Sequence, residues 1–115
     1  MRRGDIYLAD LEPVQGSEAN KVRPAVIVSR DALYRVVDER GQGVVTVVPL
    51  TRNTERVLSF QVFLPADETG LNQDSKAQAE QVRAVSVNRL RRRLGSVPPA
   101  WMAALDHALR LHLAL

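Results

Sequence analysis

Hydrophobic and polar positions along this 115-residue chain alternate in short runs, which predicts a succession of strands followed by one terminal helix. Residues 6–9 are predicted as the first strand, which Pro13 and a polar loop at Gly16 terminate. Residues 22–29 form a nearly continuous apolar run rich in β-branched side chains, which indicates a central strand. The first quarter of the chain is therefore predicted as two strands joined by a polar loop.

The middle of the chain continues this pattern after one long polar interruption. Residues 30–43 are rich in charged side chains and end in glycines, so they are predicted as a loop. Residues 44–50 are predicted as another buried strand, with Pro49 marking its end or a bulge. Residues 51–56 are polar and predicted as a loop, and residues 58–64 alternate as a half-exposed strand does.

The last third of the chain is predicted to contain two more strands and a helix. Residues 76–85 alternate small apolar and polar side chains, which favours a strand with one wet face, although their helix propensity leaves a helix as the alternative. Residues 86–90 are predicted to turn, and residues 91–95 to form a short final strand. A helix is predicted to begin at 96–99. Its predicted apolar face consists of Trp101, Met102, Leu105, Leu109 and Leu113, and Asp106 and Arg110 are predicted as a surface pair.

These elements predict one domain, residues 1–115, of mainly β class: five or six short strands in a small, strongly bent sheet or barrel capped by a C-terminal helix. The helix is apolar around most of its circumference. A helix of that kind in a small protein indicates that a second subunit buries part of its surface.

Composition narrows the function classes. The chain has no cysteine, which excludes disulfides and thiolate metal sites, and no window approaches the roughly 18 apolar residues of a membrane span. We therefore expect a cytoplasmic protein without a membrane partner. The net charge is +3, and 14 of the 16 basic residues are arginines. Arginine grips phosphate and stacks on bases, so this bias suits a nucleic-acid partner, but a GC-rich coding bias explains it equally well.

The most informative local feature is the dipeptide Arg23-Pro24 at the start of a predicted strand. Pro24 has a fixed φ and pushes Arg23 toward extended geometry, so the arginine side chain leaves the backbone in a set direction. Its guanidinium then offers a fork of donors suited to phosphate or carboxylate. Taken alone, the dipeptide favours an exposed arginine at a strand end that has no special role.

Other candidates for chemistry are few. His107 and His112 lie five residues apart on the predicted helix, a spacing that does not bring them side by side. No His, Asp and Glu cluster has metal-ligand spacing, and no glycine-rich phosphate loop is present, so we expect neither a metal nor a cofactor. Polar residues at predicted strand ends remain, each of which has an ordinary structural interpretation by itself: Arg23, Thr51, Glu80, Gln81 and Arg83.

Together these positions carry a resemblance that covers essentially the whole chain. The sequence is similar to the MazF/PemK family of toxin endoribonucleases in five motifs that keep the family's order and spacing. They are Arg3-Gly4-Asp5-Ile6-Tyr7, Leu11-Glu12-Pro13-Val14-Gln15-Gly16-Ser17-Glu18, Val22-Arg23-Pro24-Ala25-Val26-Ile27-Val28, Pro49-Leu50-Thr51 and Glu80-Gln81-Val82-Arg83-Ala84-Val85. The charged segment 30–43 and the arginines of 89–93 depart from many relatives.

The resemblance implies a small SH3-like β-barrel homodimer of the MazF/PemK/CcdB type that cuts single-stranded RNA at short sequences. It implies that Arg23 and Thr51 are the catalytic pair and that Glu80 and Gln81 contact bases. Further RNA contacts are implied for Ser17, Glu18, Asn20, Lys21 and Arg83. It also implies a MazE-like antitoxin partner with an acidic tail, and DNA binding by the toxin–antitoxin complex.

The reaction that fits this implied site is attack by the ribose 2′-hydroxyl on the adjacent phosphate, giving a 2′,3′-cyclic phosphate and a 5′-hydroxyl without a metal. Two alternatives stay open at this point. One is a CcdB-like toxin that binds DNA gyrase without catalysis, although its determinants include a tryptophan at the chain end and Trp101 lies near the helix start. The other is an RNA-binding regulator that does not cleave.

Overall fold

The computed structural model describes residues 1–11 and 22–115, and in this part of the chain seven strands form one antiparallel sheet. The strands are β1 (Asp5–Asp10), β2 (Val22–Ile27), β3 (Val44–Thr51), β4 (Gln61–Leu64), β5 (Ser75–Gln78), β6 (Arg83–Ser86) and β7 (Leu90–Ser96). The α-helices are α1 (Asp31–Arg40), α2 (Ala66–Thr69) and α3 (Pro99–Leu113), and two 3₁₀ turns are η1 (Ala79–Gln81) and η2 (Val87–Arg89).

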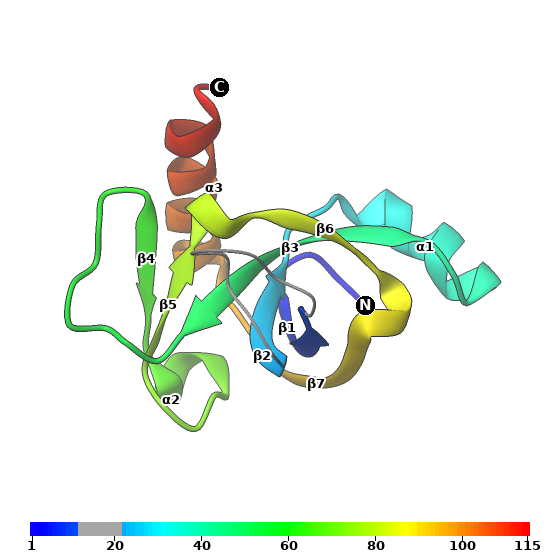
Figure 1. Cartoon of the computed structure of the whole chain (residues 1–115), viewed down its shortest axis with the longest axis horizontal. Coiled ribbons are helices and arrows are strands. Elements are labelled where there is room, and N and C mark those ends of the chain that lie inside the picture. The colour runs from blue at the N-terminus through cyan, green and yellow to red at the C-terminus, as the bar shows by residue number, and fades with distance from the viewer. Residues whose placement is uncertain (12–21) are drawn as a thin grey trace.

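The sheet is strongly bent, and its strand order is β4-β5-β3-β2-β1-β7, with β6 paired along β3 (Figure 1). No ladder between described residues joins the two end strands, β4 and β7, so the expected barrel is open. α3 stands beside β4 and β5, whereas α1 lies at the opposite end of the molecule (Figure 1). The prediction of a mainly β fold with a bent sheet and a C-terminal helix is confirmed.

Two apolar clusters hold the sheet in this shape. One joins α3 to the sheet through Met102, Leu105 and Ala108, which pack with side chains that include Val62 and Leu64 of β4. The other cluster lies under α1 and contains Ala9, Leu11, Ala25, Ile27, Tyr34, Val37, Val45, Val47 and Val85. Each helix thus covers its own part of the strongly bent sheet.

The prediction of a loop over residues 30–43 is wrong, because this segment contains the ten-residue helix α1. Its buried residues are Tyr34 and Val37, which lie on one face because they are three positions apart. The charged side chains that suggested a loop occupy the exposed face, and Gly41 ends the helix in the left-handed conformation with φ of 66°. Two buried residues are sufficient to hold α1 in place because the sheet supplies the other side chains of the apolar cluster.

Two predicted strands are shorter than expected. Residues 58–60 form a turn before β4, which is closed by a hydrogen bond of 2.9 Å from the backbone N–H of Gln61 to the carbonyl oxygen of Leu58. The strand predicted over 76–85 is divided into β5 and β6 by η1. Both pieces pair with β3, at its end and at its beginning respectively, and η1 carries the chain from one pairing to the other.

α3 follows the prediction at its start and departs from it at its end. Met102 and Leu105 are buried as expected, but Leu113 is 49% exposed, and Ala108 is buried in its place. Asp106 does not pair with Arg110: its Oδ1 atom accepts from Nη2 of Arg3 at 2.6 Å and ties the helix to the N-terminus. Neither α3 nor any other described helix has the length and apolarity of a membrane span.

A close backbone approach joins β7 to α2. A Cβ atom on Gly95 would lie 2.0 Å from the carbonyl oxygen of Thr69, so any side chain at this position would push the two elements apart. The chain that follows α2 is therefore held against β7. These two segments form one wall of the candidate active site described below.

Candidate active site

Arg23 and Thr51 lie at the neighbouring ends of two paired strands. Arg23 is the second residue of β2, and Thr51 is the last residue of β3. The ladder between these strands pairs Ala25 with Pro49, and the same register continued by two residues sets Arg23 opposite Thr51. The two residues predicted to be catalytic, 28 positions apart in the sequence, are therefore neighbours in the sheet.

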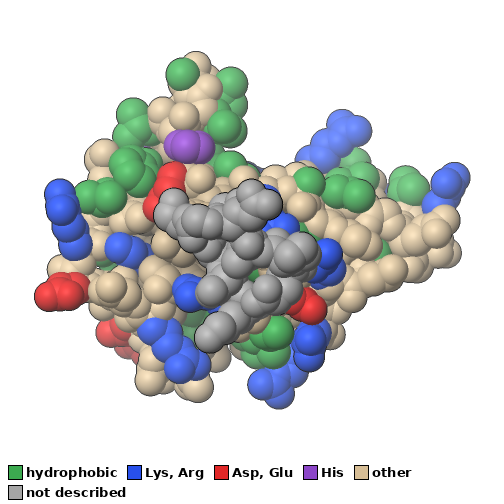
Figure 2. Space-filling view, viewed as in Figure 1, with side chains coloured by type: hydrophobic (Ala, Val, Ile, Leu, Met, Phe, Trp, Pro, Cys, Tyr) green, Lys and Arg blue, Asp and Glu red, His purple; other side chains and the backbone are tan. Residues whose placement is uncertain are grey.

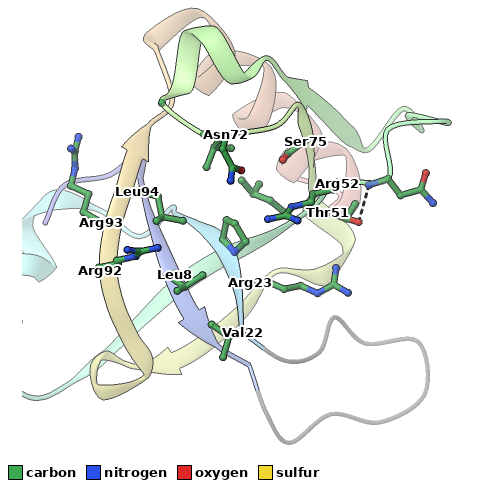
Figure 3. Close-up of a pocket in the computed structure, with 15 residues that line it drawn as sticks. Leu8, Val22, Arg23, Thr51, Arg52, Asn72, Ser75, Arg92, Arg93 and Leu94 are labelled. Atoms are coloured by element: carbon green, nitrogen blue, oxygen red, sulfur yellow. Dashed lines mark hydrogen bonds between the residues drawn. The ribbon is translucent and has the colours of Figure 1, made fainter.

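Their side chains leave the strands on the same side, as Figure 3 shows. Both side chains are partly exposed. The Thr51 hydroxyl oxygen accepts a hydrogen bond of 3.3 Å from the backbone N–H of Asn53, which orients the hydroxyl at the strand end. A guanidinium and a hydroxyl thus lie together at the strand ends, and this donor set suits a phosphate group.

A pocket of about 730 Å³ adjoins these strand ends. β1, β2, β3 and β7 contribute to its wall, together with the segment after α2 that Gly95 allows to approach. The lining residues are Leu8, Val22, Arg23, Pro24, Leu50, Thr51, Arg52, Asn53, Gly70, Leu71, Asn72, Ser75, Arg92, Arg93 and Leu94. The described residues that line it include four arginines and no carboxylate.

Arg52 and Arg92 were not predicted from the sequence as site residues. Arg52 extends from the end of β3 into the pocket, and Arg92 extends toward it from β7, on the side away from Arg23 and Thr51 (Figure 3). Neither guanidinium forms a hydrogen bond or ion pair with another residue that the structure describes. The available signal was strand alternation, which sends Arg52 to the opposite side from Thr51 and separates Arg92 from its two neighbours.

Those neighbours meet carboxylates instead. Nη2 of Arg91 lies 3.7 Å from Oδ2 of Asp10, and Nε of Arg93 lies 3.3 Å from Oδ1 of Asp5. Both acids belong to β1, the strand that pairs with β7. Although Arg93 contributes to the pocket wall, its side chain extends away from the pocket in Figure 3.

The predicted base-contacting residues Glu80 and Gln81 lie in η1, at the other edge of β3, and they do not line the pocket as far as the structure describes it. Oε2 of Glu80 accepts a hydrogen bond of 2.7 Å from Nε2 of Gln61. Its other oxygen is buried and has no hydrogen-bond partner among the described residues. Glu80 is therefore partly committed to the protein, while Gln81 is half-buried.

Arg83 is bound to the end of β1. Its Nη1 atom donates to the carbonyl oxygen of Leu11 at 3.1 Å. The other predicted RNA contacts, Ser17, Glu18, Asn20 and Lys21, lie outside the described residues. Arg83 is thus placed beside the point where that segment begins.

The histidines are remote from these groups. His107 and His112 are both exposed on α3. Within residues 1–11 and 22–115, no three His, Cys, Asp or Glu side chains are grouped as metal ligands would be. Figure 2 shows basic side chains around the ends of β3 and β7, whereas apolar side chains gather on the outer part of α3.

Comparison with known proteins agrees with this architecture. Residues 2–113 match the model of a family described as the PemK-like, MazF-like toxin of type II toxin–antitoxin systems. The chain belongs to this family. Among the relatives of this MazF-like toxin, the endoribonuclease MazF9 of Mycobacterium tuberculosis is 53% identical over 115 residues, which cover 100% of this chain and 98% of the relative.

Solved structures show the same fold. The toxin MazF-mt6 of Mycobacterium tuberculosis superposes on this MazF-like toxin with a TM-score of 0.78 at 27% identity, covering 96% of this chain and 97% of the other. A mycobacterial endoribonuclease in complex with its cognate antitoxin gives a TM-score of 0.75 at 27% identity, with coverage of 100% and 96%.

Proposed function

We propose that this MazF-like toxin is an endoribonuclease that cleaves single-stranded RNA with Arg23 and Thr51 as its catalytic pair. The supporting observation is that a guanidinium and a hydroxyl lie at neighbouring strand ends and extend to the same side. The endoribonuclease relatives favour RNA cleavage over gyrase binding. The pair requires no metal in the reaction that we propose.

In this reaction the 2′-oxygen of the ribose forms a bond to the adjacent phosphorus as the bond from phosphorus to the 5′-oxygen breaks. The 2′-hydroxyl gives up one proton and the leaving 5′-oxygen gains one, so the products are a 2′,3′-cyclic phosphate and a 5′-hydroxyl. Arg23 stabilises the charge that develops on the non-bridging oxygens, and a well-aimed donor of this kind contributes about 2.7–4 kcal/mol. Thr51 donates to the same phosphate or orients the 2′-hydroxyl.

The substrate supplies the nucleophile, which makes the 2′-hydroxyl the feature that distinguishes RNA from DNA at this site. Base preference is assigned to Gln81 and Glu80, whose amide and carboxylate can read base edges in unpaired RNA. Oε2 of Glu80 already accepts a hydrogen bond from Gln61, so Glu80 must release Gln61 or keep one oxygen on it when it contacts a base. Arg83 and the predicted contacts Ser17, Glu18, Asn20 and Lys21 would hold the RNA backbone nearby.

The toxin is proposed to act in the cytoplasm as a homodimer, restrained by an antitoxin with an acidic tail. Leu111 and Leu113 at the end of α3 are 51% and 49% exposed, and Leu115, just beyond the helix, is 85% exposed, which supports burial of this surface by a second subunit. The net charge of +3 suits an acidic tail electrostatically.

The test is cleavage of a long, mixed-sequence RNA in EDTA by the wild type, by Arg23→Ala and by Arg35→Ala, which removes an exposed arginine of α1. We expect the wild type and Arg35→Ala to produce fragments ending in a 2′,3′-cyclic phosphate, and Arg23→Ala to produce none while it elutes as a dimer. Undiminished cleavage by Arg23→Ala would refute the catalytic assignment.

Base reading is tested by sequencing the 5′ ends of the same fragments. Gln81→Ala should broaden the set of cleaved sequences more than it slows cleavage at the preferred one. An unaltered set of cleavage sites would remove Gln81 from sequence recognition.

A further inference from the structure

We propose that Arg52 and Arg92 bind the phosphate of a nucleotide next to the scissile bond, and that the pocket between them holds that nucleotide. The proposal rests on the RNA-cleaving function given above. It assigns to the pocket a single-stranded RNA subsite that adjoins the catalytic pair and does not include Glu80 or Gln81 of η1.

The pocket is continuous with the catalytic pair. Thr51 and Arg52 are consecutive residues at the end of β3, and successive side chains of an extended strand point to opposite sides. Figure 3 shows this divergence, with Thr51 on the side of Arg23 and Arg52 in the pocket. An RNA strand that crosses the strand end with its scissile phosphate at Thr51 therefore brings a neighbouring nucleotide to Arg52.

The charges at the pocket favour an anion. Arg52 and Arg92 approach the pocket from different strands, and both are exposed. Their charge is not neutralised by a carboxylate of the described chain, whereas Arg91 and Arg93 in the same strand each meet one. Two cations that face one pocket repel each other, and this arrangement becomes favourable when an anion lies between them.

The remaining wall of the pocket suits a base. Leu8, Pro24 and Leu94 give the pocket an apolar side, and the amide of Asn72 points into it (Figure 3). A base can lie against the apolar side while the amide offers it a donor and an acceptor. The volume of about 730 Å³ lies within the range of small-ligand pockets, so a nucleotide fits.

These features favour RNA over an acidic peptide. A peptide carboxylate would satisfy the arginines, but it would leave the apolar side and the Asn72 amide without a planar partner. A nucleotide uses the charged, amide and apolar parts of the wall together.

The experiment compares the double variant Arg52→Gln/Arg92→Gln with Arg35→Gln/Arg91→Gln, which removes the same charge from α1 and from β7 outside the pocket. The probe is a fluorescent RNA with one cleavage site, made uncleavable by a 2′-deoxy group at the cut nucleotide. We expect the pocket variant to bind it about tenfold more weakly than the control. The slope of log affinity against log salt should be shallower by about 0.7 for each phosphate that is no longer bound. On the cleavable RNA, KM should rise by a similar factor while kcat changes less than about twofold.

Neutral methylphosphonates placed singly at each flanking position locate the phosphate that the arginines bind. One of them should weaken binding to the wild type and the control but leave the pocket variant unaffected. Equal affinities of the pocket variant and the control, with normal wild-type cleavage, would overturn the subsite alone. A wild type that neither binds nor cleaves RNA would overturn the proposed function as well. If the pocket variant binds a synthetic acidic peptide more weakly than the control does, but binds RNA equally well, the pocket is a peptide site and the RNA subsite is overturned.

Discussion

Arg91 and Arg93 differ from Arg23, Arg52 and Arg92 in what their guanidinium groups face. The first two extend from β7 toward carboxylates of β1, at 3.7 and 3.3 Å. The other three line the pocket at the start of β2, at the end of β3 and on β7, and no described carboxylate contributes to its wall; Arg93 also belongs to this wall, but its Nε atom lies against Asp5. One residue type thus meets carboxylates in one region and, in the function that we propose, binds an anionic ligand in the other. Neighbouring side chains alone, and not the residue type, separate the two roles.

The largest expected effect comes from replacing an arginine by lysine, which keeps the positive charge and removes the planar set of guanidinium donors. Arg23→Lys should lower kcat on single-stranded RNA by about 100-fold, because an ammonium cannot hold two phosphate oxygens in the guanidinium geometry. Arg91→Lys, in the β1–β7 region and outside the pocket, should change kcat by less than about twofold. Single-turnover cleavage of both variants measures this, and equal losses would mean that the two regions do not differ in function.

The second prediction removes a carboxylate that an arginine of β7 meets. Asp5 is only 9% exposed, and its Oδ2 atom accepts from the amide of Arg2 at 2.9 Å while its Oδ1 atom meets Arg93. Asp5→Asn should lower the free energy of unfolding by about 2 kcal/mol, because hydrogen bonds to a charged group are removed in a buried place. Urea unfolding followed by the fluorescence of Trp101 measures this.

The matched control is Asp38→Asn, since Asp38 is exposed and lies 3.8 Å from the N-terminal ammonium. Its cost should stay below about 0.5 kcal/mol. Both variants should cleave RNA with the wild-type kcat at temperatures where they are folded. A lowered kcat in folded Asp5→Asn would mean that the ion pairs between β1 and β7 also affect catalysis, and it would contradict the separation of the two regions.

The smallest expected effect is on the pH dependence of stability, and it arises from Tyr7 of β1. Burial, and then the Asp5 carboxylate, raise the pKa of Tyr7 above its ordinary value of 10.0. A group whose pKa is raised by folding contributes stability that is present below the unfolded pKa and is lost as the pH rises through the folded pKa. Wild-type stability should therefore fall more steeply than that of Tyr7→Phe above about pH 10, by less than about 1 kcal/mol. Urea unfolding at several alkaline pH values tests the difference, and parallel curves would contradict it.

The core of the fold was predictable because the relevant signals are local. β-branched runs marked β2 and β3, and the apolar stripe with its leading prolines marked α3. α1 was missed because only Tyr34 and Val37 of its ten residues are buried, a pattern too sparse to outweigh its charges. The division of the strand predicted over 76–85 could not be predicted from the sequence, because it arises when β5 and β6 pair with two different parts of β3.

The sequence alone determined the strand-rich fold class, the family resemblance and the identity of Arg23 and Thr51 as candidates, since these depend on residue type and order. Only the tertiary structure decided which arginines meet carboxylates and which line a pocket, and that Asp106 binds Arg3 rather than Arg110. The physical reason is that a guanidinium interacts over a few ångströms in space. Such distances between residues remote in sequence are set by strand register and by close approaches such as that of Gly95 to Thr69.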